Sequence, residues 1–126
     1  MNKLILLMWL MFSTSLFAEP VVFSCNTEKH TINIYRNADQ KIFTYKSWNK
    51  PKPITNKPDM ELKSSINEVS GSGECRFEEY RFKTGKTEFV IDNNFKCTEE
   101  NPPKNAIGSL WVFINDDMKS HYWCVK

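Results

Sequence analysis

Histidine is scarce in this chain, and the motifs that usually accompany catalysis are missing. Only two of the 126 residues are histidines, and neither His30 nor His121 has a carboxylate or cysteine at metal-ligand spacing. The chain has no glycine-rich phosphate loop and no recognisable Ser/His/Asp motif. Glu78 and Glu79 are adjacent, so on a regular strand their side chains point to opposite faces. We therefore expect a protein that is not an enzyme and that binds no metal ion or cofactor.

Net charge is also nearly absent. The chain has 17 Lys and Arg residues against 15 Asp and Glu residues. Lys3 is the only charged residue among the first 18, so removal of that segment leaves 16 basic against 15 acidic residues. A nucleic-acid-binding domain needs a net basic face to release counterions. The composition therefore predicts no nucleic-acid partner.

Long apolar runs are missing beyond the start of the chain. Residues 4–12 are apolar, and a short polar stretch and Ala18 follow them. This run is too short to span a bilayer and is typical of a secretory signal peptide over residues 1–18. We expect residues 19–126 to form a single β-domain that is periplasmic or secreted and has no membrane span. Lipidation of Cys25 stays an open alternative, although Glu19 and Pro20 separate this cysteine from the apolar run.

The cysteines lack the Cys-x-x-Cys spacing of zinc knuckles and redox sites. Four of them, an even number, lie in the expected mature chain, which in an exported small domain indicates two disulfides. Three pairings are possible. We favour Cys25 with Cys124, because the terminal strands of small β-domains often meet, and Cys75 with Cys97, which would join a hairpin to the next segment.

Alternating apolar and polar residues predict an all-β fold. About eight short strands, with no convincing helix, indicate a small antiparallel β-barrel or a two-layer β-sandwich. The proline-containing stretch 48–59 and the stretch 98–108 are predicted as irregular loops. The strand candidates cover residues 21–25, 31–36, 41–47, 60–66, 77–83, 87–91, 95–97, 109–115 and 118–125.

A long hairpin over residues 70–91 is the organising element. Phe77 is out of step with Tyr80 and Phe82, so we predict a β-bulge near Glu78 or Glu79. Core positions are predicted at Tyr80, Phe82, Phe89, Ile91, Trp111 and Phe113. Trp111, Phe113, Tyr122 and Trp123 lie on facing strands, where they either fill the barrel or line a ligand cavity.

The ends of this hairpin are the predicted binding surface. The glycines at its entry bring backbone close to a partner, and the lysines at its tip carry charge on a rigid turn. The partner-binding residues are predicted to be Ser70, Gly71, Ser72, Gly73, Arg76, Lys83, Thr84, Gly85 and Lys86. Two other options stay open: contact of Lys50, Lys52 and Lys57 with an acidic partner, and a small apolar or saccharide ligand bound by Trp48, Trp111 or Trp123.

Three short motifs resemble those of the periplasmic and membrane-bound inhibitors of c-type lysozyme. They are Phe23-Ser24-Cys25, Ser72-Gly73-Glu74-Cys75-Arg76 and Phe82-Lys83-Thr84-Gly85. Arg76 stands where that family has its inhibitory tyrosine, and Thr84 separates Lys83 from Gly85. The chain is also similar to exported immunity proteins that neutralise wall-degrading effectors. The resemblance implies a protein that binds and inhibits another protein, a cell-wall (peptidoglycan) hydrolase. It implies no particular oligomeric state.

Overall fold

Nine antiparallel strands make up almost all of the regular structure. The computed structural model describes residues 19–37, 41–94, 97 and 101–126. The strands are β1 Val21–Asn26, β2 His30–Arg36, β3 Phe43–Asn49, β4 Met60–Ser64, β5 Asn67–Ser70, β6 Phe77–Thr84, β7 Thr87–Asp92, β8 Ala106–Ile114 and β9 Asp117–Val125, and a short 3₁₀ turn covers Gly73–Cys75. The all-β prediction is confirmed. β5 was not predicted as a separate strand. It lies beside β6 and extends the predicted hairpin by one strand.

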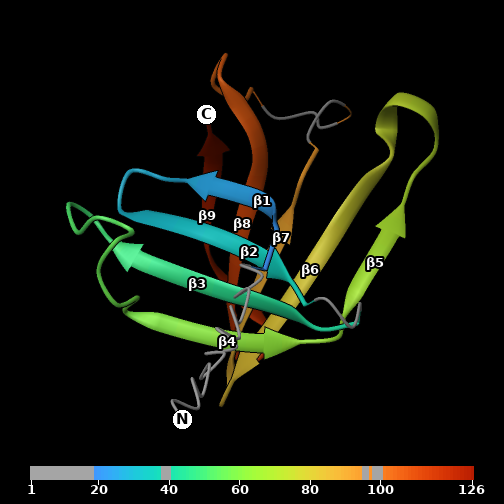
Figure 1. The fold of residues 1–126 in the computed structure, drawn as a ribbon. Coiled ribbons are helices and arrows are strands. Elements are labelled where there is room, and N and C mark those ends of the chain that lie inside the picture. Colours follow the sequence, from blue (N-terminus) through green and yellow to red (C-terminus); the bar gives the residue numbers. More distant parts are fainter. Residues whose placement is uncertain (1–18, 38–40, 95–96, 98–100) are drawn as a thin grey trace, which may run out of the picture.

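The strands form one sheet that folds into two layers. Their order is β4-β3-β2-β1-β9-β8-β7-β6-β5, so every neighbour is consecutive in sequence except β1 and β9. In Figure 1 the strands β1 to β4 cross in front of the strands β6 to β9. β4 lies against β6, although the two are not hydrogen-bonded neighbours and the sheet is not closed. The fold is therefore an open barrel or two-layer sandwich.

The first and last strands hold the two layers together. In the described chain, one residue pair, Asn26 with Val125, joins β1 to β9. The disulfide Cys25–Cys124 lies beside this pair and is almost completely buried. The second disulfide joins Cys75 to Cys97, and none of the described cysteines is free. Both predicted pairings are confirmed, and they are consistent with an oxidising compartment.

The core lies between the two layers. Alternate residues of each strand point inward, as a half-buried antiparallel sheet requires. The buried apolar residues of this core are Cys25, Ile32, Ile34, Phe43, Tyr45, Tyr80, Phe82, Ile91, Leu110 and Cys124. Phe89 and Tyr122 are partly buried and pack against them, so the predictions for Tyr80, Phe82, Phe89, Ile91 and Tyr122 are confirmed.

Trp111 and Phe113 are not part of this core, contrary to the prediction. Leu110 and Val112 are the β8 residues that face the core, so their neighbours Trp111 and Phe113 lie on the outer face of the sheet. Trp123 pairs with Ser109 on the same outer face. The apolar run on β8 has no alternation, so its sequence does not indicate which face is buried.

The predicted bulge near Glu78 and Glu79 is also wrong. The register of β6 against β5 and β7 is continuous, from Ser70 with Phe77 to Thr84 with Thr87. Phe77 is simply on the outer face, since it lines the same surface as Glu79 and Arg81. Register shifts occur instead in β1, between Val21 and Phe23, and twice in β8.

Some predictions fall on other parts of the chain. The predicted signal peptide, residues 1–18, and most of the predicted strand 95–97 lie outside the described residues. The second predicted loop is shorter than expected, because β8 begins at Ala106. No helix within the described ranges is long and apolar enough to cross a membrane.

Candidate functional site

The outer face of the β5 to β9 layer carries charged and aromatic side chains in regular rows. Because Tyr80, Phe82, Phe89 and Ile91 face the core, the residues between them on β6 and β7 point outward. The cross-strand register then sets three rows on this face. They are Glu79-Asp92-Ser109-Trp123, Arg81-Val90-Trp111-His121 and Lys83-Glu88-Phe113-Met118.

One guanidinium group is held between two carboxylates in these rows. Arg81 Nη2 lies 3.1 Å from Glu79 Oε2, and Arg81 Nη1 lies 3.1 Å from Glu88 Oε1. All three side chains are partly shielded from solvent. The two bonds fix the guanidinium in place and already satisfy part of its hydrogen-bonding capacity.

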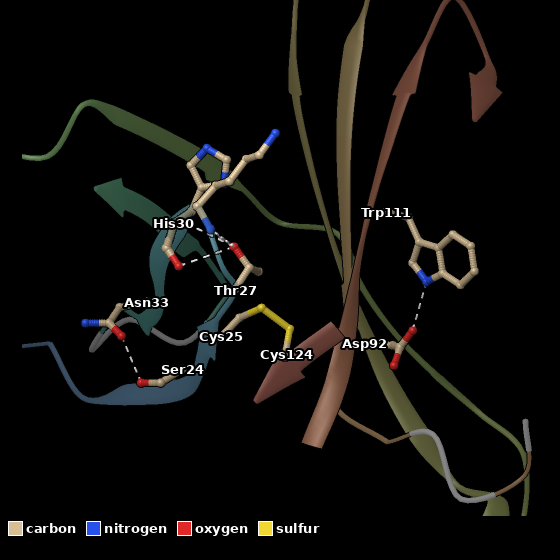
Figure 2. Close-up of a disulfide and its surroundings, with 9 residues drawn as sticks. Ser24, Cys25, Thr27, His30, Asn33, Asp92, Trp111 and Cys124 are labelled. Carbon is tan, nitrogen blue, oxygen red and sulfur yellow. Dashed lines mark hydrogen bonds between the residues drawn. A yellow bond between two sulfur atoms is a disulfide. The ribbon is translucent and has the colours of Figure 1, made fainter. Parts of the chain in front are cut away.

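Asp92 is bound by the indole of Trp111 across the strand pair. Trp111 Nε1 donates a hydrogen bond to Asp92 Oδ2 at 3.1 Å. Figure 2 shows both side chains on the side of the sheet that faces away from the Cys25–Cys124 disulfide. Burial raises the pKa of Asp92 to about 6; the bond from Trp111 and backbone amides oppose this effect, and the nearby Glu79 adds to it. Asp92 is therefore mostly ionised at neutral pH but poorly hydrated.

Two more rings extend the aromatic surface onto β9. The ring centroids of Trp111 and His121 are 4.1 Å apart, and those of His121 and Trp123 are 4.7 Å apart. Trp111, His121 and Trp123 therefore form a continuous aromatic strip beside Asp92. Aromatic rings have flat apolar faces that carry the negative end of a quadrupole.

A pocket of about 550 Å³ lies on this face. Its floor is the buried Val90, and its walls combine apolar rings with the charged groups described above. The residues that line it are Gly71, Cys75, Phe77, Glu79, Arg81, Val90, Asp92, Asn94, Cys97, Trp111 and Phe113. Few polar groups within a mainly apolar lining is the usual composition of a binding site.

The loop before β6 forms one wall of the pocket and is tightly held. The Cys75–Cys97 disulfide ties it to the segment after β7, and Asn94 Nδ2 donates hydrogen bonds to the carbonyl oxygens of Glu74 and Arg76. Gly71 has a φ of +76°, and a Cβ atom there would lie 2.3 Å from the Cys75 carbonyl oxygen. The loop therefore requires glycine at this position.

The predicted binding residues lie at the two ends of β6. Gly71 lines the pocket, and Ser70, Ser72, Gly73 and Arg76 belong to the same loop. Lys83, Thr84, Gly85 and Lys86 lie at the opposite end, beside Asn115 and Asp116 of the β8 to β9 turn. The six β6 residues from Phe77 to Phe82 separate the two groups, so Arg76 and Lys83 are about 23 Å apart along the strand.

The proline-containing loop is irregular from residue 50 to residue 59, as predicted, and the Trp48 indole before it is buried. Trp48 is the penultimate residue of β3 and is only 3% exposed, and its Nε1 donates to the carbonyl oxygen of Asn56. The indole is therefore a structural anchor of the loop and does not offer a surface to a ligand. Lys52 forms an ion pair with Asp59, which fixes it within the loop.

The other candidate groups are dispersed. Glu78 accepts a hydrogen bond from the Tyr80 hydroxyl while Glu79 bonds Arg81, so the two glutamates face opposite sides as predicted. Among the described residues, no three His, Cys, Asp or Glu side chains are grouped to hold a metal ion. A second pocket of about 360 Å³ lies between the layers, with His30, Asp59 and Tyr122 at its polar side.

The charged part of the pocket was missed by sequence reasoning, although one signal was available. Phe77, Glu79 and Arg81 are spaced by two residues, as are Glu88, Val90 and Asp92. Both sets share the face opposite Tyr80 and Ile91, which predicts one outward surface. The position of Trp111 over this surface depends on the β7 to β8 register, for which the sequence has no marker.

The chain matches no family model, no curated protein and no solved structure.

Proposed function

We propose that this chain is an exported, non-enzymatic protein that binds and inhibits another protein through the outer face of its β5 to β9 layer. The observation that carries the proposal is the pocket around Asp92 and Trp111, framed by a disulfide-linked loop. A cell-wall hydrolase is the class of partner suggested by the sequence resemblance.

Rigidity of the frame supports a recognition role. The walls of the pocket are sheet strands, and its loop is fixed by a disulfide and by hydrogen bonds from Asn94. A surface that is already ordered loses less conformational entropy when a partner docks. Tryptophan and arginine are also the residues that most often dominate binding energy in protein interfaces.

The size of the surface favours a protein over a small molecule. A standard interface covers about 800 Å² on each partner, which is roughly 30 Å across. The glycine-containing loop and the Lys83 to Lys86 turn are about 23 Å apart along β6. A protein that lies along β6 therefore contacts the pocket and the lysine turn together.

A saccharide ligand is the second candidate, and the position of the Trp111 indole in the lining of the pocket favours it. The pocket is within the usual size range of small-ligand sites, and Asp92 and Arg81 supply polar groups beside the aromatic rings. In this case the ligand occupies the pocket alone and the lysine turn makes no contribution.

The test is capture of a partner by immobilised residues 19–126 from envelope and competitor-cell lysates, followed by affinity measurements with the purified partner. We expect Trp111→Ala to weaken binding by about 10-fold or more. Adding Lys83→Glu/Lys86→Glu to this variant should weaken binding further. Tyr35→Ala, on the outer face of the other layer, is the matched control. Unchanged affinity in Trp111→Ala would contradict the proposed surface. An oligosaccharide that raises the melting temperature, with no protein captured, would favour the second candidate.

A further inference from the structure

We infer that the pocket beside Trp111 and Asp92 accepts a basic side chain, lysine or arginine, from the partner. This inference rests on the proposed function and specifies the chemistry of the group that enters the pocket. Three observations carry it: the balance of charge, the aromatic lining and the environment of the Asp92 carboxylate.

Among the described residues, the charged side chains that line the pocket have a net negative charge, with two carboxylates against one guanidinium. Glu79, Asp92 and Arg81 line the pocket, and Glu88 bonds Arg81 from the neighbouring strand. Arg81 is held by both glutamates, so its positive charge is already compensated within the protein. Within the described ranges, the groups that bond Asp92 are the Trp111 indole and backbone amides, and none of them is cationic. An entering cation therefore completes the charge balance, whereas an anion would face uncompensated repulsion.

The aromatic lining suits a cation as well. Phe77, Trp111 and Phe113 all line the pocket. A positive charge over the face of an aromatic ring is attracted by the ring quadrupole, and tryptophan is the strongest partner. The alkyl part of a lysine or arginine side chain also covers apolar surface, such as Val90 at the floor. A neutral apolar side chain gains only this second contribution.

The Asp92 carboxylate gains most from such a partner. Its Oδ2 is bound by Trp111 and its Oδ1 is closed off from solvent, so the ionised group is poorly hydrated. Burial is the main cause of its raised pKa. A nearby cation stabilises a carboxylate more in a partly desolvated site than in water, because solvent screens it less.

The experiment uses short peptides on the intact mature protein. Residues 19–126 contain three tryptophans, Trp48, Trp111 and Trp123, whose indole N–H signals are resolved in a ¹H–¹⁵N spectrum and assigned by single Trp→Phe variants. The probes are blocked glycine pentapeptides with lysine or arginine at the centre, and the neutral controls carry norleucine or citrulline. We expect the basic peptides to shift the Trp111 indole signal and the neutral peptides to bind at least about 5-fold more weakly.

Two variants and one control test the charge directly. Asp92→Asn and Glu79→Gln keep the shape of the side chains and remove a negative charge, so each should lower the affinity for the basic peptides by about 5-fold. Glu61→Gln, an exposed position on β4, should leave it unchanged. Glu79→Gln gives an independent reading if Asp92→Asn does not fold. Equal binding of the lysine and norleucine peptides, or unchanged affinity in the charge variants, would overturn the inference.

The outcomes separate this inference from the proposed function. If Trp111→Ala abolishes partner binding but the basic peptides do not shift the indole signal, the surface stands and the charge assignment is wrong. If an N-acetylglucosamine oligomer shifts the same signal and the basic peptides do not, the inference is overturned and the saccharide candidate takes its place.

Discussion

At the scale of single residues, Asp92 is the group whose environment departs most from that of an ordinary surface carboxylate. It lies on the outer face of a sheet, yet it is partly buried beneath the Trp111 indole and beside Glu79. A protein that used Asp92 only for stability would do better with a neutral residue, since desolvating a charge is unfavourable. Retention of the charge is therefore consistent with a role in binding.

Asp92→Asn should change how stability depends on pH. The pKa of Asp92 is raised from 3.8 to about 6 in the folded protein, so the native state holds this proton more tightly than the unfolded chain does. Its contribution to the free energy of unfolding is therefore greatest below about pH 4 and is lost as the pH rises through about 6. Relative to the Asn variant, the wild type should lose about 1–2 kcal/mol between those limits, a value reduced for solvent screening.

Urea unfolding of both proteins across this pH range measures the effect. Other carboxylates titrate in both proteins, so the difference between the two curves isolates Asp92. Glu61→Gln, at an exposed position of β4, serves as the control for removal of a carboxylate elsewhere on the surface. A constant difference between wild type and Asp92→Asn across the range would show that the carboxyl is not desolvated.

The residues of β8 show where sequence reasoning stops. Tyr80 and Phe82 alternate with Glu79 and Arg81, so the buried face of β6 is readable from the chain. In β8 the consecutive residues 110–114 are all apolar, so there is no alternation to indicate which side chains face the core. The pairing of β7 with β8 determines which side chains of β8 face the core. Ile91 of the core pairs with Leu110, and this places Trp111 on the outer face.

At the scale of elements, the close approach of β7 and β8 depends on Gly108. A Cβ atom at this position would lie 2.1 Å from the Asp92 carbonyl oxygen and 3.0 Å from Phe23 Cζ. The first of these contacts is with backbone, so it is relieved only if a strand moves. This explains why a glycine stands near the start of β8, next to the register shift between Ala106 and Gly108.

Gly108→Ala should therefore destabilise the protein by about 2 kcal/mol or more, as overpacking of a core does. The variant should also disturb the Trp111 indole signal, because the clash displaces the strand that carries Asp92. Denaturant unfolding gives the first value and NMR the second. Glu68→Ala, at an exposed position of β5, should change stability by less than about 0.5 kcal/mol. Equal stability of Gly108→Ala and wild type would mean that the strands have room to separate.

The loop that walls the pocket depends on its disulfide. In the chain-entropy model, closing the 22-residue separation between Cys75 and Cys97 stabilises the fold by about 3 kcal/mol. A Cys75→Ala/Cys97→Ala variant should lose that stability and should bind the partner more weakly, because the loop is no longer preorganised. Partner affinity equal to that of the wild type would show that the loop is not part of the interface.

The elements themselves were largely predictable, and their exceptions have physical causes. Alternation in β2 and the glycine turn of the β6 to β7 hairpin identify those strands directly. β5 was missed because Asn67 to Ser70 have little apolar pattern, and its pairing with β6 compensates for this. The predicted bulge failed because it assumed that Phe77 shares a face with Tyr80 and Phe82, whereas Phe77 lines the pocket on the outer face.

At the scale of the whole molecule, the two halves are joined mainly by core packing and by the contact of β1 with β9. One described residue pair and the Cys25–Cys124 disulfide make up that strand contact. The Cys25–Cys124 pairing was predictable from the general proximity of terminal strands, and a barrel or two-layer sandwich was predicted from the pattern of strands. The way the sheet stays open, with β4 lying against β6, was not predictable. It follows from how far each half of the meander twists, which no local pattern encodes.

Removal of this disulfide should be the most damaging change of the set. A separation of 99 residues gives a stabilisation of about 4–5 kcal/mol in the chain-entropy model, which is a large part of the stability of a small domain. Cys25→Ala/Cys124→Ala should unfold at a much lower urea concentration than Cys75→Ala/Cys97→Ala. Hydrogen exchange should show faster opening of β1 and β9 in the former variant. The reverse ranking of the two variants would contradict this account.

The nested order of the two disulfides also matters during synthesis. The chain emerges from its N-terminus, so Cys25 and Cys75 are available together before Cys97 and Cys124 have appeared. The first bond that a passing oxidant can form is therefore a non-native one, and the native partner of Cys25 is the last cysteine made. Oxidative maturation should consequently need a disulfide isomerase, and Cys75→Ser/Cys97→Ser should mature without one. The pairing of the first strand with the last thus predicts that correct disulfide formation in this small domain depends on an isomerase.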